Sequence, residues 1–252
     1  MRVIITGASS GIGTALARYY LHAGVTLGLI ARRIEPLRQL AETAAGRVET
    51  YAADVRDTAA MQTAAAHFIA RHGSPDIVIA NAGISVGTMT QIAEDIAAFQ
   101  DVMDTNVVGM VKTFQPFLGA MRDARRGALV GIASVAGYRG LPGAAAYSAS
   151  KAAAISYLES LRVELSGSGL RVVTICPGYI ETPMTVKNPY PMPFIMSADM
   201  AARKIAAIIE SGNSFAVTPW QMAVVARLLR IVPNWLFDLA LRGAPHKPRR
   251  GE

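Results

Sequence analysis

The sequence predicts an α/β fold: a doubly wound parallel sheet of about seven strands with helices on both faces. Two observations carry this prediction. Short apolar segments rich in β-branched residues alternate with Ala-rich helical segments along almost the whole chain. Several of these segments are apolar throughout, which is typical of strands buried on both faces. Apolar residues make up 52% of the 252 residues and charged residues 17%. We therefore expect residues 1–252 to form a single domain around one large core.

The elements of the N-terminal half follow one another in a regular order. The first strand, RVIIT, begins at Arg2, and a glycine-containing turn then opens a helix that continues to about Ala23. Further strands are expected in VTLGLIA, VETYAA and DIVIA, each short, apolar and β-branched. Helical spacing is found in 57–72 and again in 92–123. Because strands and helices alternate, the strands are expected to pair in parallel through right-handed crossovers.

The C-terminal half repeats the pattern and then interrupts it. GALVGIAS, LRVVTIC and SFAVT are the remaining expected strands, and 146–166 is a long Ala-rich helix. Between the last two strands, residues 178–197 form a Pro/Met-rich insertion. Loops of this length in compact domains are usually lids or binding loops, so we expect a substrate lid here. Its mobile apolar cover would consist of Pro191, Met192, Pro193, Phe194, Ile195 and Met196.

Residues 219–242 form an apolar helical extension of two segments hinged at Pro233, followed by a basic tail, 243–252. Charges and Pro233 interrupt the apolar run well short of the ~20 residues that a membrane-spanning helix needs. Three interpretations remain open: a lid over the substrate cleft, a contact between subunits, or a helix that lies on a lipid surface. The last would make the protein peripheral to a membrane.

Composition and charge exclude several functions. Cys176 is the one cysteine, so no disulfide framework can form, and the first strand starts at Arg2 without room for a leader. We therefore expect a cytoplasmic protein. The net charge is +7, but residues 242–252 hold four Lys/Arg against one Glu, or +3 of it, so nucleic acid is not an expected partner. The four histidines are scattered, and no metal site is predicted.

The turn after the first strand has the composition of a phosphate-binding loop. Gly7, Gly11 and Gly13 in ITGASSGIG follow the strand and open the first helix. Glycines let the backbone approach a phosphate, and the free N–H groups at the helix N-terminus favour its negative charge. In a strand–turn–helix unit this arrangement predicts a Rossmann-like dinucleotide site, although G-x-x-x-G-x-G differs from the older G-x-G-x-x-G fingerprint.

The end of the second strand indicates which dinucleotide binds. An NAD site needs a carboxylate there for the ribose 2′-hydroxyl, whereas this chain has Ala31 followed by Arg32 and Arg33. An arginine pair suits a 2′-phosphate, and the alternative is a solvated surface pair. The sequence therefore predicts NADP(H), with NAD(H) less favoured and Arg32 as the main contact.

Tyr147 and Lys151 stand one helical turn apart, so their side chains rise from the same face of the helix. The ordinary tyrosine pKa, near 10, is too high for efficient proton exchange at neutral pH. A nearby ammonium, like a cationic oxidised nicotinamide, would lower it. Tyr147 could then exchange a proton with a carbonyl or an alcohol, while Ser134, at the carboxyl end of a strand, hydrogen-bonds the same oxygen. Seen alone, the two residues could equally be a surface Tyr–Lys pair.

Several motifs occur together in the order typical of one family. They are TGASSGIG (6–13), NAG (81–83), Asn106 in DTNVVG, Ser134 in GIASVAG, YSASK (147–151) and PG (177–178). Over about residues 1–183 the chain resembles the short-chain dehydrogenases/reductases. The resemblance implies a homodimer or homotetramer and a catalytic tetrad. In that tetrad Asn106 helps to hold a proton-relaying water, and Lys151 also grips the nicotinamide ribose. The four members of this tetrad would be Asn106, Ser134, Tyr147 and Lys151.

The resemblance also implies a set of cofactor contacts at matching positions. Asp54 would meet the adenine amine, and Asn81 would steady the sheet near the adenosine ribose. Ile180 and Thr182 would reach the nicotinamide carboxamide. The predicted contacts are Gly7, Ser9, Ser10, Gly11, Ile12, Gly13, Arg32, Arg33, Asp54, Val55, Asn81, Ala82, Gly83, Tyr147, Lys151, Pro177, Gly178, Ile180 and Thr182.

The function expected from these features is hydride transfer between NADP(H) and a hydrophobic ketone or secondary alcohol, with Tyr147 as general acid/base. Few charges other than Arg139 and Lys187 stand near the expected cleft, which favours a hydrophobic substrate. Two alternatives remain. One is reduction of a 3-oxoacyl thioester on an acyl carrier protein, bound by Arg122, Arg125 and Arg126. The other is a catalytically silent NADP(H)-binding sensor.

Overall fold

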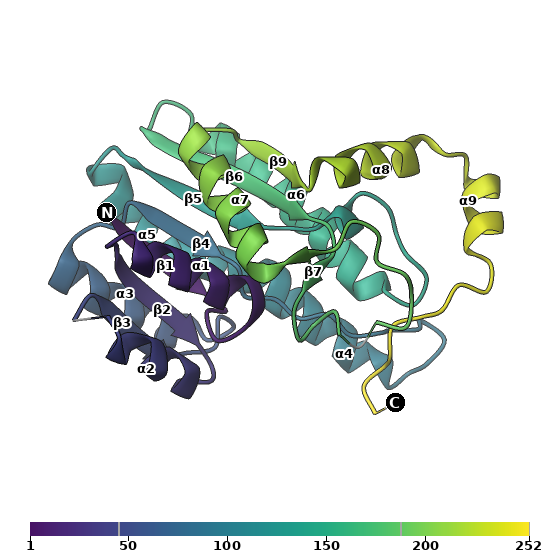
Figure 1. Ribbon diagram of the computed structural model, residues 1–252, viewed down its shortest axis with the longest axis horizontal. Helices are drawn as coiled ribbons and strands as arrows, with labels where there is room; N and C mark the ends of the chain where they lie inside the picture. The colour runs from purple at the N-terminus through teal and green to yellow at the C-terminus, as the bar shows by residue number, and fades with distance from the viewer. Residues whose placement is uncertain (45, 187, 252) are drawn as a thin grey trace.

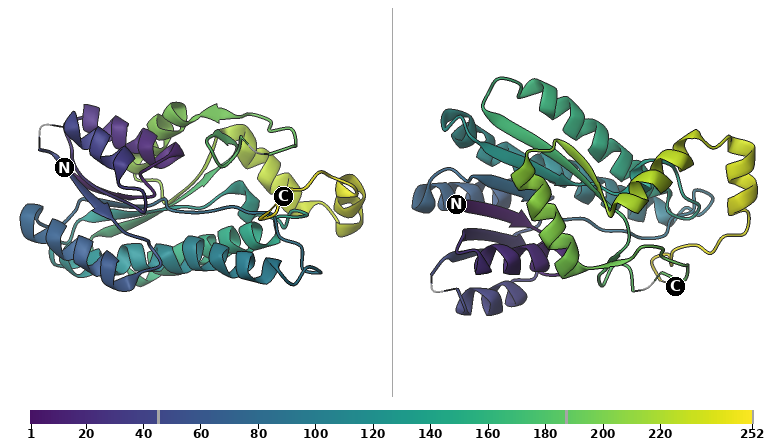
Figure 2. Two further views of the ribbon diagram at one scale, coloured as in Figure 1. Left: turned by 90° about the horizontal axis from the view of Figure 1, so that it is seen from below. Right: turned by 45° about the horizontal axis from the view of Figure 1, so that its top comes forward.

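A parallel sheet of seven strands forms the centre of the molecule, in the order β3–β2–β1–β4–β5–β6–β9. The computed structural model describes residues 1–44, 46–186 and 188–251. Figures 1 and 2 show the sheet between two layers of helices. The strands of this sheet are β1 (Arg2–Thr6), β2 (Thr26–Ala31), β3 (Val48–Ala52), β4 (Ile77–Ala80), β5 (Gly127–Ile132), β6 (Leu170–Pro177) and β9 (Phe215–Thr218).

The helices follow the strands as the alternating pattern predicts. Those that precede β9 are α1 (Gly11–His22), α2 (Glu35–Glu42), α3 (Thr58–His72), α4 (Asp95–Met103), α5 (Gly109–Asp123), α6 (Ala145–Glu164) and α7 (Ala198–Ser211). The segment 92–123, predicted as helical, holds α4 and α5 joined by a π-helical turn, Asp104–Val108. Helix α2 was not predicted, because it is only eight residues long and holds one buried side chain, Leu37.

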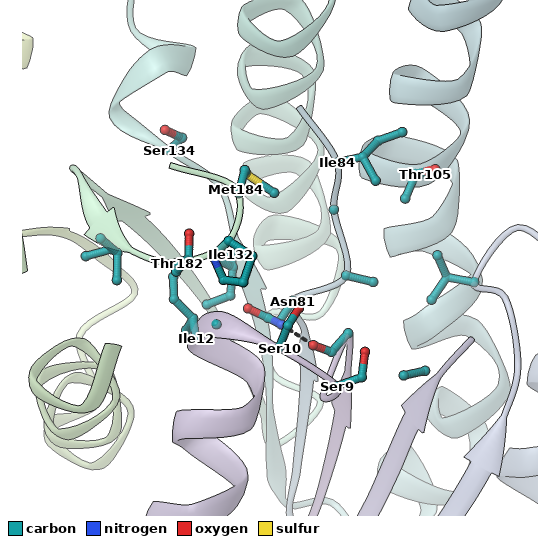
Figure 3. Close-up of a pocket in the computed structure, with 18 of the residues that line it drawn as sticks. Ser9, Ser10, Ile12, Asn81, Ile84, Thr105, Ile132, Ser134, Thr182 and Met184 are labelled. Atoms are coloured by element: carbon teal, nitrogen blue, oxygen red, sulfur yellow. Dashed lines mark hydrogen bonds between the residues drawn. The ribbon is translucent and has the colours of Figure 1, made fainter. Parts of the chain in front are cut away.

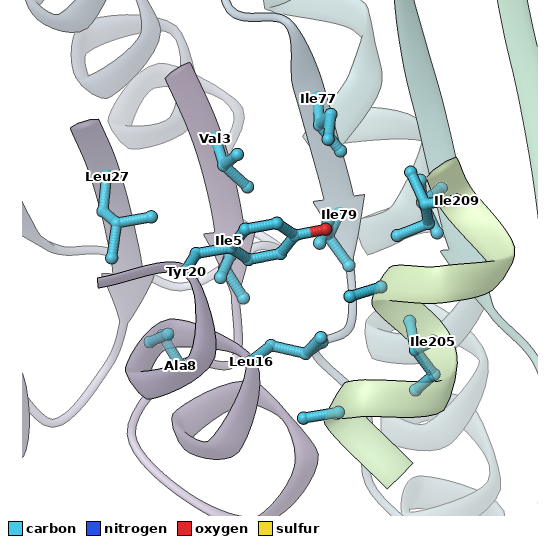
Figure 4. Close-up of a cluster of buried hydrophobic side chains, with 14 of the residues drawn as sticks. Val3, Ile5, Ala8, Leu16, Tyr20, Leu27, Ile77, Ile79, Ile205 and Ile209 are labelled. Atoms are coloured by element: carbon cyan, nitrogen blue, oxygen red, sulfur yellow. The ribbon is translucent and has the colours of Figure 1, made fainter. Parts of the chain in front are cut away.

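Each face of the sheet has its own hydrophobic layer. Helices α1, α2 and α7 cover one face, where the aromatic ring of Tyr20 lies over Ile5 and near Ile209 (Figure 4). Helices α3, α5 and α6 cover the other face, where Phe68 and Phe114 pack among aliphatic side chains. Side chains that project from either face of a central strand therefore enter an apolar layer, which is why those strands are apolar throughout.

The strand order positions the functional site. The chain proceeds outward from β1 to β3 on one side, then crosses back to β4 on the other side of β1. In open α/β sheets, ligands bind at the carboxyl ends of the strands, next to such a reversal of strand order. The turn after β1 and the loop after β4 meet at this point, where Asn81 Nδ2 donates hydrogen bonds to Thr6 O at 3.0 Å and Gly7 O at 3.3 Å.

The insertion 178–197 has more regular structure than its composition predicts. Two short strands, β7 (Ile180–Glu181) and β8 (Met196–Ser197), pair in parallel within it. Met196 is buried in a small cluster with Ile180 and Ala201. The prediction that Met196 belongs to a mobile cover is therefore wrong, because strand pairing places its side chain against α7. Phe194 and Ile195 are exposed, as a cover would require.

The C-terminal extension consists of α8 (Trp220–Ile231) and α9 (Asn234–Leu241), with the bend at Pro233 that the sequence predicts. Met222 and Ala226 of α8 are buried, whereas α9 buries no side chain completely. The chain beyond α9 then returns toward the lid and α4 (Figure 1). Among the described residues, no helix combines the length and hydropathy that crossing a membrane requires.

Candidate active site

A cavity of about 420 Å³ lies at the carboxyl edge of the sheet. Its walls come from the turn after β1, the ends of β2 and β3, the loop after β4, the end of β5, the start of α6 and the lid. Figure 3 shows Ser9 and Ser10 of the turn at one end of this cavity and Ser134 at the other. We call it the cofactor cavity.

The turn after β1 requires its glycines. Gly7 and Gly11 adopt φ values of 65° and 55°, in the left-handed region that side chains with a Cβ rarely occupy. A Cβ at Gly7 would lie 2.8 Å from Ala82 Cα, and one at Gly13 would lie 2.6 Å from Asn81 Nδ2. The turn is therefore packed closely against the loop after β4, and Gly7, Ser9, Ser10 and Gly11 line the cavity. Gly13 is not on the cavity wall. It provides the close packing of α1 instead.

The end of the cavity beside β2 and β3 carries two arginines and a paired aspartate. Arg32 and Arg33 line the wall and are exposed, and Arg33 Nη2 lies 3.5 Å from Ser9 O. The carboxylate of Asp54 accepts hydrogen bonds from Arg56 at 2.8 and 3.1 Å. These hydrogen bonds hold the pKa of Asp54 below its usual value, with a smaller contribution from Arg32. Asp54 is thus an ionised, fixed group, and its partner Arg56 was not predicted from the sequence.

Ser134, Tyr147 and Lys151 converge at the other end of the same cavity. Ser134 caps the short 3-10 helix Val135–Gly137 by accepting a hydrogen bond from Ala136 N at 3.1 Å. Lys151 is 4% exposed, and its Nζ donates a hydrogen bond to Ile132 O at 2.8 Å. Tyr147 and Lys151 stand one turn apart near the start of α6, so the same-face geometry predicted for them is present.

The electrostatics of Tyr147 differ from the prediction. Burial raises the pKa of Tyr147 above its ordinary value, and a hydrogen bond with Ser134 opposes this rise in part. The ammonium of Lys151 donates its hydrogen bond to Ile132 O, and its Nζ lies 5.7 Å from the centre of the Tyr147 ring. Burial also lowers the pKa of Lys151, to about 8. The residues by themselves therefore keep the phenol protonated at neutral pH.

Asn106 lies beside the cavity rather than on its wall. Its Oδ1 accepts from Ile84 N at 2.8 Å, and its Nδ2 donates to Ile84 O and to Ser150 Oγ, both at 2.9 Å. The side chain thereby ties the loop after β4 to α6, and the π-helical turn directs it inward. The water-holding role implied by the family resemblance stays a prediction.

The cavity includes most of the predicted cofactor contacts and further residues that were not predicted. Apart from Gly13, every predicted contact lies on its wall. The residues that were not predicted lie next to strand ends or predicted motifs in the sequence. Adjacency to those positions was therefore the one sequence feature that could have identified them. They are Ile30, Ala31, Ala53, Ile84, Thr105, Ile132, Ala133, Pro183, Met184 and Thr185.

A second cavity, of about 180 Å³, adjoins the first at Ser134, Tyr147, Gly178 and Met184. Apolar side chains from the lid and α8 dominate its wall, among them Met222, Val225 and Leu229. We call it the substrate cavity. Of the predicted cover residues, Pro193 reaches this wall. Helix α8 therefore packs over the cleft, as one of the three interpretations of the extension requires.

Two predictions about charges need correction. Arg139 borders the substrate cavity, but its guanidinium is used structurally: it donates to Leu229 O, Val232 O and Asn234 Oδ1 and stacks on Phe237, with Cζ 3.8 Å from the ring centre. It fastens α8 and α9 rather than facing a substrate. Lys187 lies outside the described residues. Lys247, from the C-terminal tail, lines this cavity and was missed.

The arginines proposed to bind a carrier protein lie far from this site. Arg125 and Arg126 precede β5, whereas Ser134 follows it, so they stand at opposite edges of a parallel sheet. Arg126 pairs with Asp76 at 3.7 Å, and Arg125 Nη2 donates to Gly167 O. Their position does not support a carrier that delivers its acyl group to Ser134.

Comparison with known proteins identifies the family. The model of the short chain dehydrogenase family matches residues 1–191. The chain belongs to the short-chain dehydrogenases/reductases. Among the relatives of this short-chain dehydrogenase, an uncharacterized oxidoreductase of Myxococcus xanthus is 40% identical over 242 residues, or 95% of each chain. A putative ketoacyl reductase of Streptomyces coelicolor is 32% identical, covering 90% of this chain and 94% of that protein.

A solved structure extends the likeness to the whole fold. A short-chain dehydrogenase from Burkholderia cenocepacia, crystallised in complex with NADP, matches with a TM-score of 0.82 at 26% identity, covering 96% of this chain and 97% of that one. The Rossmann-like fold and the oxidoreductase class predicted from the motifs are confirmed.

Proposed function

We propose that this oxidoreductase is NADP(H)-dependent and transfers hydride between the nicotinamide and a hydrophobic ketone or secondary alcohol, with Tyr147 as general acid/base. One observation carries the proposal: a single cavity holds the glycine turn and Arg32 at one end and Ser134, Tyr147 and Lys151 at the other. A dinucleotide binding along this cavity would bring its redox ring to a proton donor.

The residues present fit such a cofactor. Gly7 and Gly11, which adopt left-handed φ values, have no side chain that would cover the backbone at the N-terminus of α1, where a pyrophosphate would lie. Arg32 has no hydrogen-bond partner among the described residues, which leaves its guanidinium available to a 2′-phosphate. The NADP complex of the Burkholderia relative also favours this cofactor.

The bound cofactor supplies a hydride for the carbonyl carbon, and the protein supplies the proton. The pKa of Tyr147, raised by burial, keeps its hydroxyl protonated, so it can donate to the carbonyl oxygen in the reductive direction. Ser134, whose hydroxyl shares the cavity, would hydrogen-bond the same oxygen and hold it in place. Lys151 lies one turn away, so its ammonium would stabilise the phenolate that forms and return a proton to it.

The substrate cavity supports a hydrophobic substrate, because its wall is mostly apolar and includes Ser134 and Tyr147. A 3-oxoacyl thioester is the second candidate, favoured by the ketoacyl reductase name of the Streptomyces relative. A silent sensor has less support, since every member of the predicted tetrad is present. We further propose a cytoplasmic homodimer or homotetramer. Exposed apolar residues on α4, α5 and the turn between them, such as Ile96, Phe99 and Val111, favour assembly.

The test is a turnover assay that monitors nicotinamide absorbance. Ketones and 3-oxoacyl thioesters are tested with NADPH and NADH in parallel, and alcohols with the two oxidised coenzymes. Tyr147→Phe should lower kcat by about 100- to 10,000-fold, the range for loss of a general acid, while the Kd for NADPH stays near that of the wild type. Tyr157→Phe, on the same helix but away from the cavity, is the matched control and should retain activity. If NADPH binds and no compound turns over, the sensor interpretation replaces this one.

A further inference from the structure

The C-terminal tail closes one side of the substrate cavity. Gly87 N donates a hydrogen bond to Pro248 O at 3.0 Å, and Gly87 forms a parallel β-bridge with Arg249. Arg249 Nε also pairs with Asp95 Oδ2 at 2.9 Å, and Arg250 with Asp101 at 2.7 Å. Backbone pairing and two ion pairs thus fix the tail across the loop after β4 and helix α4.

Two glycines make room for this tail. A Cβ at Gly87 would collide with the carbonyl oxygen of Lys247 and would lie 2.8 Å from that of Pro248. At Gly143, where φ is 66°, a Cβ would lie 2.7 Å from the Cβ of His246. The tail therefore packs so closely against Gly87 and Gly143 that a larger side chain at either position would displace it. This packing holds Lys247, which lies between the two contacts, in a defined place.

Lys247 brings an ammonium to the wall of the substrate cavity. Within the described part of the chain its Nζ donates one hydrogen bond, to Met184 O at 3.3 Å, and Met184 borders both cavities. An ammonium has three donors, so further donors remain for a ligand. Burial lowers the pKa of Lys247 to about 8, and the group is still mostly charged at neutral pH.

This ammonium has no carboxylate partner among the described residues. Apart from Lys247, the charged side chain on the described wall is Arg139, which is held by α8 and α9, and no Asp or Glu lines the cavity. A partly buried charge without a counter-ion is unfavourable, and an anion placed beside it would offset that cost. The apolar wall between Lys247 and the catalytic hydroxyls would then hold an aliphatic linker.

We propose that Lys247 forms an anion subsite, and that the preferred substrate carries its carbonyl at Ser134 and Tyr147 and a terminal carboxylate or similar anionic group at Lys247. This inference rests on the proposed function, because that function fixes the reacting end of the substrate. It narrows the substrate class from hydrophobic ketones to oxo acids with an apolar spacer.

The test compares 4-oxopentanoate, 5-oxohexanoate and 6-oxoheptanoate with their methyl esters as substrates for NADPH-dependent reduction. For the best spacer length, wild-type kcat/KM should favour the acid by about 10- to 100-fold, the range for a hydrogen bond to a charged group. In Lys247→Met this ratio should fall close to one through a rise in KM for the acid. The Lys247→Arg variant should keep most of the wild-type preference for the acid over the ester.

Two further variants separate the subsite from overall charge. Lys204→Met removes an exposed lysine of α7 that lines neither cavity, so the ratio should remain that of the wild type. Gly87→Ala leaves Lys247 in the sequence but displaces the tail, so the ratio should fall as in Lys247→Met. A wild type that uses acid and ester equally, or a Lys247→Met variant with the wild-type ratio, overturns the proposal.

A binding measurement tests the subsite without turnover. Hexanoate and hexanamide are titrated calorimetrically into enzyme saturated with NADP⁺. Hexanoate should bind the wild type about 10-fold or more tightly than it binds Lys247→Met, and hexanamide should bind both alike. If this holds while no ketone is reduced, the proposed function fails and the anion subsite stands. Equal hexanoate binding by the two proteins refutes the subsite whatever the enzyme reduces.

Discussion

Replacing Lys151 by methionine should remove activity and yet stabilise the cofactor-free protein at neutral pH. Lys151 is 4% exposed, and burial lowers its pKa from 10.5 to about 8. At 1.36 kcal/mol per pKa unit, that difference corresponds to a cost of about 3 kcal/mol for burying the charged form. Methionine fills a similar volume without the charge. Loss of the hydrogen bond to Ile132 O offsets part of the gain, by about 1–3 kcal/mol.

The pH dependence gives this prediction its sign. Between about pH 8 and 10.5 the unfolded chain binds a proton at Lys151 that the folded chain does not, so the wild type becomes more stable as pH rises. The methionine variant lacks this dependence. Its free energy of unfolding relative to the wild type should therefore fall by about 2 kcal/mol between pH 7 and pH 9.5.

Urea unfolding at several pH values measures the difference directly. At pH 7 the variant should equal the wild type or exceed it by up to about 2 kcal/mol. Lys204→Met, which removes an exposed lysine, should change the free energy of unfolding by less than about 0.5 kcal/mol at every pH. Two results would refute the reasoning: a Lys151→Met protein that is clearly less stable than the wild type at pH 7, or a difference in free energy of unfolding between the two proteins that does not change with pH.

Three further outcomes are expected. Arg32→Ala should raise the Kd for NADPH by about 10-fold or more, the loss of a hydrogen bond to a charged group, while leaving the Kd for NADH almost unchanged; equal effects on both coenzymes would contradict the cofactor proposal. Gly13→Ala should lower the free energy of unfolding by about 1–3 kcal/mol, because its Cβ would strike Gly7 O and Asn81 Nδ2, and urea titration measures the loss. Arg139→Met should release α8 and α9, seen as faster limited proteolysis beyond Pro219 at unchanged NADPH affinity; unaltered cleavage would show that the arginine does not fasten them.

The sheet was predictable because its signals are local. Strands buried on both faces must be apolar along their length, and glycine is required where the turn after β1 adopts left-handed φ values. Ser134 was expected at the carboxyl edge of the sheet for a similar reason, since it directly follows a strand and the carboxyl ends of parallel strands meet at one edge. Residues adjacent to those ends, such as Thr105 and Met184, carry no pattern of their own and were missed.

The features that were mispredicted depend on contacts between distant parts of the chain. Arg139 was expected to face a substrate, but α8 and α9 fold back to accept its hydrogen bonds. The path of the tail, which brings Lys247 to the cavity, depends on the pairing of Gly87 with Arg249. The direction of the Tyr147 pKa depends on burial, which helical spacing does not reveal. None of these has a signature within a short window of sequence.

A crystal structure of the protein with NADP⁺ would show whether the nicotinamide ring binds beside Tyr147. The 2′-phosphate should lie against Arg32 or Arg33, and the hydroxyl of Tyr147 should lie beside the reactive carbon of the nicotinamide ring. A complex in which that ring binds away from Tyr147, with Ser134 and Lys151 facing no part of the coenzyme, would contradict the proposed function.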